Sequence, residues 1–151
     1  MAATHKNEVI ERFSIKTTDY SILNMLVGAR ELLHMSFLKS AISKFTCCVQ
    51  SLLISDDGYF YGINSDGSTY DVTLSNEEIE ILATLMSVQW IDKILLDRTL
   101  LQQHFGTKEI KLNSPAQHMK ELNSIRDYYI GEASDMMASY QYKAKKYGSA
   151  T

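Results

Sequence analysis

Proline, cysteine and long apolar runs are scarce in this sequence, and each shortage excludes a class of protein. The only proline is Pro115, which leaves no proline-rich linker, so we expect the 151 residues to form a single domain, 1–151. No apolar run reaches the roughly 18 residues that a membrane-spanning helix needs, and the N-terminus lacks a signal-peptide pattern. The net charge of −3 argues against a purely electrostatic grip on nucleic acid. We expect a globular protein that folds in the cytoplasm and has no membrane partner.

Motifs for catalysis, cofactors and metals are missing as well. The four histidines are scattered, without metal-ligand spacing, and there is neither a glycine-rich phosphate loop nor a nucleophile elbow. Cys47 and Cys48 are adjacent, which suits a disulfide poorly, so buried reduced thiols are a better interpretation than a bridge or a nucleophile. We predict no enzyme activity, no cofactor and no metal site.

Two long helices organise the second half of the chain. Ser75 followed three residues later by Glu78 is a capping-box pattern, and the residues after it are apolar on nearly every side to about Leu96. This pattern predicts a buried central helix over about 75–96. Ser114 before Pro115 opens a second helix, about 114–146, which carries one apolar stripe: Met119, Leu122, Ile125, Tyr129, Ala133, Met136 and Tyr140.

The first half is predicted to be helical over about 7–54, with the residues from Val49 to Ile54 continuing the helix. The period then changes to two in a hairpin of about 59–73, turned by Asn64–Gly67; a calcium loop is a weaker interpretation of the same residues. Residues 97–113 suggest a short helix, a stop at Gly106 and an extended piece. The expected fold class is mainly α: a helical bundle with two long C-terminal helices and one β-hairpin.

Two surfaces are candidates for contact with a partner. The first is a flexible C-terminal arm in which tyrosine alternates with lysine: Tyr140, Tyr142, Lys143, Lys145, Lys146 and Tyr147. The second is the hairpin, through Tyr59, Phe60, Tyr61 and Tyr70, because a two-stranded hairpin is marginal in water and needs helices or a neighbour to complete it. A frayed basic helix end explains the first surface equally well.

The order of these elements resembles a family of phage proteins. Apolar helices end in Lys44-Phe45-Thr46-Cys47-Cys48, and a strand-rich stretch leads to 74–83 (LSNEEIEILA) with Gln89-Trp90-Ile91. Residues 112–116 (LNSPA) follow, with Lys120-Glu121-Leu122. Over roughly 43–142 the chain is similar to the head-to-tail adaptor (connector) proteins of tailed phages.

This resemblance implies a structural virion protein without catalytic residues, located at the neck, the head–tail interface, and assembled in the bacterial cytoplasm. It implies a homo-oligomeric ring of twelve copies that docks on the portal protein and continues the channel through which DNA passes without specific recognition. The C-terminal arm would then face the portal, and the hairpin would meet the next subunit, the tail or another neck protein. The alternative is a small intracellular helical binding or regulatory protein.

Overall fold

The computed structural model describes residues 2–17, 20–109 and 115–148, and it describes side chains at 2–17, 22–99 and 117–146. The helices are α1 (Lys6–Lys16), α2 (Tyr20–Leu23), α3 (Val27–Lys44), α4 (Asn76–Glu109) and α5 (Pro115–Gly148). The strands β1 (Leu53–Ile54), β2 (Phe60–Ile63) and β3 (Thr69–Asp71) lie between α3 and α4. The fold is mainly α, as the sequence predicted.

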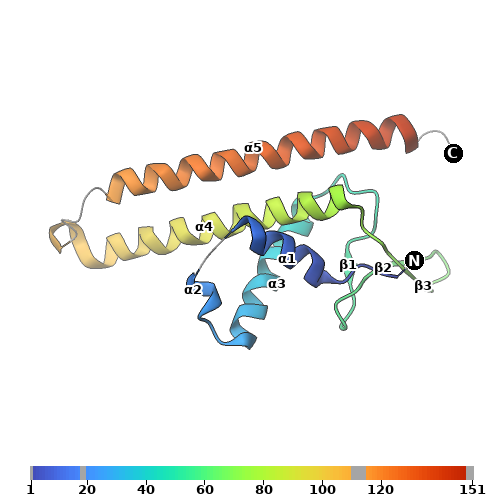
Figure 1. Cartoon of the computed structure of the whole chain (residues 1–151), viewed down its shortest axis with the longest axis horizontal. Coiled ribbons are helices and arrows are strands. Elements are labelled where there is room, and N and C mark those ends of the chain that lie inside the picture. Colours follow the sequence, from blue (N-terminus) through green and yellow to red (C-terminus); the bar gives the residue numbers. More distant parts are fainter. Residues whose placement is uncertain (1, 18–19, 110–114, 149–151) are drawn as a thin grey trace.

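Helix α4 is the centre of the molecule. It lies between α5 on one side and α1 and α3 on the other, and it packs against all three (Figure 1). Every residue from Glu78 to Val88 is therefore buried, except Glu80, which is half-buried. The predicted capping box is present: the Glu78 amide donates to Ser75 Oγ at 3.1 Å, and the Ser75 amide donates to Glu78 Oε1 at 2.8 Å. A helix that is apolar on nearly every side is stable here because neighbours cover it on both sides.

The main difference between the predicted and the observed long helices is the C-terminal end of α4. Helix α4 does not stop near residue 96 or at Gly106 but continues to Glu109, because a single glycine costs a helix only about 1 kcal/mol against alanine. The predicted extended piece continues from Glu109 into residues outside the described part of the chain. Helix α5 runs antiparallel to α4 (Figure 1), and an ion pair between Arg126 and Asp92 joins the two.

The hairpin is confirmed, but it has a third strand. Strands β2 and β3 pair antiparallel, with Tyr61 opposite Asp71, and Gly67 takes a φ of 87° in the predicted turn. On the other edge, Leu53 and Ile54 of β1 pair with Tyr61 and Phe60. The prediction that residues up to Ile54 continue the helix was therefore wrong. Helix α3 ends at Lys44, and the short apolar run after it suits a strand as well as a helix.

The N-terminal segment closes the base of this sheet. The Thr4 amide donates to the Val72 carbonyl at 2.9 Å, the Phe60 amide donates to the Thr4 carbonyl at 2.9 Å, and the Leu74 amide donates to Thr4 Oγ1 at 2.9 Å. Phe60 and Val72 are consequently buried in the core. Strand β1 and the N-terminal segment thus complete the hairpin from within the same chain. From the sequence, we expected helices or a neighbouring molecule to complete it.

Candidate functional site

The hairpin residues predicted to contact a partner divide between surface and core. Tyr59 and Tyr70 are exposed, Tyr61 is half-buried, and Phe60 is fully buried. The Tyr70 ring lies against Gly62, where the Cβ atom of any other residue would stand 2.1 Å from Tyr70 Cζ. Only a glycine allows this close approach of the ring to the strand. Phe60 therefore holds the sheet on the helices, and the tyrosines form its accessible part.

The residues of the predicted C-terminal arm also divide between surface and core. Tyr142, Lys143, Lys145 and Lys146 are exposed on the last described turns of α5, whereas Tyr140 is only 7% exposed. The side chain of Tyr147 lies outside the described residues. The segment is the end of a helix packed on α4, so the structure gives no free arm before Gly148, and Tyr140 faces the core.

Tyr140 belongs to a buried polar cluster that joins three parts of the chain. Its hydroxyl donates to Glu78 Oε2 at 2.8 Å and accepts the Val49 amide at 2.9 Å. The Cys48 thiol lies 3.4 Å from the same Glu78 oxygen. The Tyr140 ring meets Phe45 edge to face, with centroids 5.2 Å apart. We call Glu78, Tyr140 and Cys48 the polar lock, because they fix the end of α5 to the start of α4 and to the loop after α3.

The chemistry of the polar lock is that of a structural contact. Burial is the main cause that raises the pKa of Cys48 to about 12, and the neighbouring Glu78 carboxylate adds to it. Burial also raises the pKa of Tyr140, as does its hydrogen bond to Glu78. Both groups therefore keep their protons at neutral pH and act as hydrogen-bond donors to a carboxylate that is 2% exposed. A thiol with so high a pKa is a poor nucleophile.

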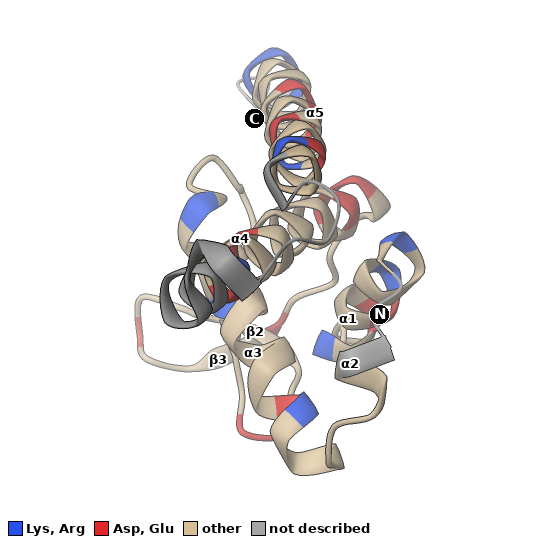
Figure 2. Ribbon diagram, turned by 90° about the vertical axis from the view of Figure 1, so that its left-hand side faces the viewer, with Lys and Arg blue, Asp and Glu red and all other residues tan. Residues whose placement is uncertain are grey.

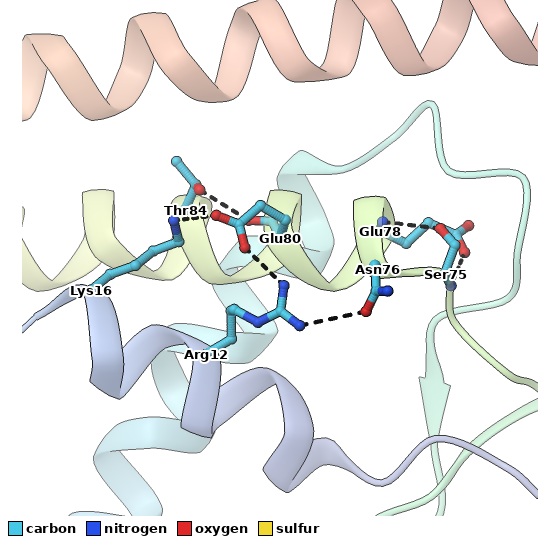
Figure 3. Close-up of polar contacts among 7 residues, drawn as sticks. All are labelled: Arg12, Lys16, Ser75, Asn76, Glu78, Glu80 and Thr84. Carbon is cyan, nitrogen blue, oxygen red and sulfur yellow. Dashed lines mark hydrogen bonds and ion pairs between the residues drawn. The ribbon is translucent and has the colours of Figure 1, made fainter.

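A second polar contact attaches α1 to the opposite side of α4 (Figure 3). Arg12 donates to Glu80 Oε2 at 3.0 Å, and Lys16 forms an ion pair with Glu80 Oε1. Partial burial opposes ionisation of Glu80, but the two cations outweigh it, so the pKa of this carboxyl lies below its usual value. Arg12 also reaches Asn76 at the helix start, which fixes α1 along the first turns of α4.

The sheet carries a groove. Its volume is about 690 Å³, and the N-terminal segment, the loop after β1 and strands β2 and β3 line it. We call it the sheet groove and define it by the residues that give it its character: Ile54, Asp56, Tyr59, Tyr61, Thr69 and Asp71. Tyrosine walls with carboxylates beside them suit an apolar or aromatic group that carries positive charge.

The strands and loops that line this groove carry only acidic charges, whereas His5 and Lys6 of the N-terminal segment lie beside Gly58 at one end of it. From Phe45 to Asp92 the sequence contains no lysine, arginine or histidine, whereas Asp56, Asp57, Asp66 and Asp71 all belong to the sheet or its loops. Figure 2 shows red on these loops. This acidic stretch was visible in the sequence and would have indicated an acidic surface on the sheet.

A further exposed region was not predicted from the sequence. Leu23, Leu26, Val27 and Leu32 are each more than half exposed at the corner where α2 meets α3. We call these residues the α2–α3 corner. The helical spacing of these residues is also that of a buried face, so the sequence pattern did not indicate that they are exposed.

Comparison with known proteins adds no relative: no family model, no curated protein and no solved structure matches the chain. Within the described residues, no helix is long and apolar enough to cross a membrane. The same residues hold no group of three or more His, Cys, Asp or Glu side chains placed to bind a metal ion.

Proposed function

We propose that this chain is a structural virion protein, a ring-forming head-to-tail adaptor that docks on a phage portal and continues the DNA channel toward the tail. The observation that carries the proposal is the number of separate surfaces with large exposed apolar side chains. They lie on the sheet (Leu53, Ile63), at the α2–α3 corner and on α5 (Tyr128, Tyr142). Large exposed apolar patches usually mark contacts, and several on one chain suit a protein covered by several neighbours.

The shape of the molecule supports the same proposal. Helices α4 and α5 have 34 residues each, which at about 1.5 Å per residue gives a length of about 50 Å. The two run together past α1 and α3 as a hairpin (Figure 1), and the described residues of α4 after Ile91 are no longer buried. Long paired helices of this kind can stand side by side around a ring.

The net charge of −3 is compatible with a channel, because a lining that binds DNA weakly lets it slide. That the chain contacts the portal on one side and the tail on the other is part of the same proposal.

The alternative function, a small helical binding or regulatory protein, is favoured by one observation. Strand β1 and the N-terminal segment complete the sheet without a neighbour. A compact monomer would have the same arrangement, whereas an adaptor can have it before or after assembly.

Binding to a portal separates the two functions. The purified chain is mixed with purified portal rings of the same phage and followed by size-exclusion chromatography with light scattering. The adaptor proposal predicts co-elution at about one copy per portal subunit. A companion variant is Leu26→Glu with Leu32→Glu, which changes the exposed α2–α3 corner without touching the core, and the adaptor proposal predicts that this variant assembles less well. A chain that stays monomeric and does not bind the portal would support the regulatory function instead.

A further inference from the structure

The sheet groove and the end of α5 are complementary in charge. The groove presents Asp56 and Asp71 between tyrosines, and residues 53–71 contain no lysine, arginine or histidine, although His5 and Lys6 lie beside Gly58 at one end. The end of α5 presents Lys143, Lys145 and Lys146 around Tyr142. A chain that carries both halves of a matched pair on its surface has the requirements for contact with its own copies.

Helix geometry places the residues of the α5 end on one face. At 100° per residue, Tyr142, Lys143, Lys145 and Lys146 fall within an arc of about 160°, and Tyr140 points away from the middle of that arc. Since Tyr140 points at Glu78 on α4, Tyr142, Lys145 and Lys146 lie on the outward side, and Lys143 lies at its edge, 3.5 Å from Glu77 on α4. We call these four residues the basic end. The polar lock holds it in a fixed orientation, so little freedom is lost when it binds.

The placement of the two surfaces matches the geometry of a ring. Both lie at the same end of the molecule along the axis of the long helices (Figure 1). In both views α5 and the sheet lie on opposite sides of α4 (Figures 1 and 2). Rotation about an axis keeps the height of every residue, so neighbours in a ring whose axis follows the helices meet through surfaces at equal height. Equal height and opposite sides are what a closed head-to-tail contact needs.

We propose that the basic end of one copy docks in the sheet groove of the next copy. Tyr142 packs between Tyr59 and Tyr61, and lysines of the same helix face approach Asp56 and Asp71. The contact rests on the proposed ring and assigns the basic end to the joint between copies rather than to the portal. In its own chain the basic end lies along α4, where Lys143 is 3.5 Å from Glu77.

Charge reversal on each side tests this contact. One variant carries Lys145→Glu and Lys146→Glu, and a second carries Asp56→Lys and Asp71→Lys; all four residues are exposed. Lys39→Glu with Lys120→Glu is a control for the first variant, with the same change of charge at exposed sites elsewhere. Self-association of the full chain is measured by analytical ultracentrifugation between about 50 and 500 mM salt, a range over which screening changes strongly. Circular dichroism checks that each variant is folded.

The proposal predicts that each reversed variant alone loses association by at least about tenfold, because like charges then meet, while the control behaves as the wild type. An equimolar mixture of the two reversed variants should regain association, since each basic surface again meets an acidic one. Wild-type association should weaken as salt rises.

Three results would overturn the proposal: association of the reversed variants at wild-type strength, failure of their mixture to recover, or a wild-type chain that stays monomeric at every salt concentration. The adaptor function is judged separately by portal binding. Reversed variants that still co-elute with the portal as full rings would contradict this contact but support the adaptor function. Recovery of association in the mixture without portal binding would support this contact but contradict the adaptor function.

Discussion

Removing one hydroxyl group from the polar lock should measurably destabilise the protein. In Tyr140→Phe the ring can keep its edge-to-face contact with Phe45, but the Glu78 carboxylate loses a donor at 2.8 Å. Glu78 is 2% exposed, so water does not replace that donor, whereas the residue Val49, which also loses a partner, is 70% exposed. A hydrogen bond to a charged group contributes about 1.5–3 kcal/mol, and we expect a loss in this range.

Urea unfolding followed by circular dichroism measures this loss, with Tyr142→Phe as the control. Tyr142 is on the same helix but 67% exposed, so its change should stay within about 0.5 kcal/mol. Equal stabilities of Tyr140→Phe and the wild type would refute the interpretation that Tyr140 stabilises a buried carboxylate.

Other variants test the remaining contacts. The lowered pKa of Glu80 means that its stabilisation is complete above the ordinary carboxyl pKa of 4.5 and is lost as the pH falls through the lower folded value. The stability gap between Glu80→Gln and the wild type should therefore narrow in acid, and a gap independent of pH would contradict the ion pair. Cys48, with a pKa of about 12, should react with iodoacetamide at pH 8 only after unfolding, and rapid labelling of Cys48 in native Cys47→Ser protein would contradict its place in the polar lock. Leu82→Ala, in the core part of α4, should lower the free energy of unfolding in urea by about 2–5 kcal/mol. Leu96→Ala, at a residue that is 58% exposed, should lower it by less than about 1 kcal/mol. Equal losses for the two variants would contradict the burial of α4 around Leu82.

Local signals in the sequence were sufficient for the long helices. The capping box at Ser75 and the proline at the start of α5 act within one turn, so they could be read without knowing the fold. The apolar stripe on α5 also placed Tyr140 correctly in the core, although the alternation of tyrosine and lysine around it favoured a surface role.

Contacts between distant parts of the chain could not be predicted in this way. Strand β1 has two residues, and its pairing with β2 depends on the position of the loop after α3 rather than on its own pattern. The polar lock joins residues 62 positions apart, and nothing in the local sequence of Glu78 indicates Tyr140 as its partner. The sheet groove needed the N-terminal segment, which sequence periodicity did not connect to the hairpin.

The mass of the assembled protein tests the proposed adaptor most directly. Native mass spectrometry of the purified chain, alone and with purified portal, should be combined with electron microscopy of any large species. The account predicts closed rings of about a dozen copies, formed by the chain itself or on the portal. A chain that remains monomeric in both conditions would contradict it.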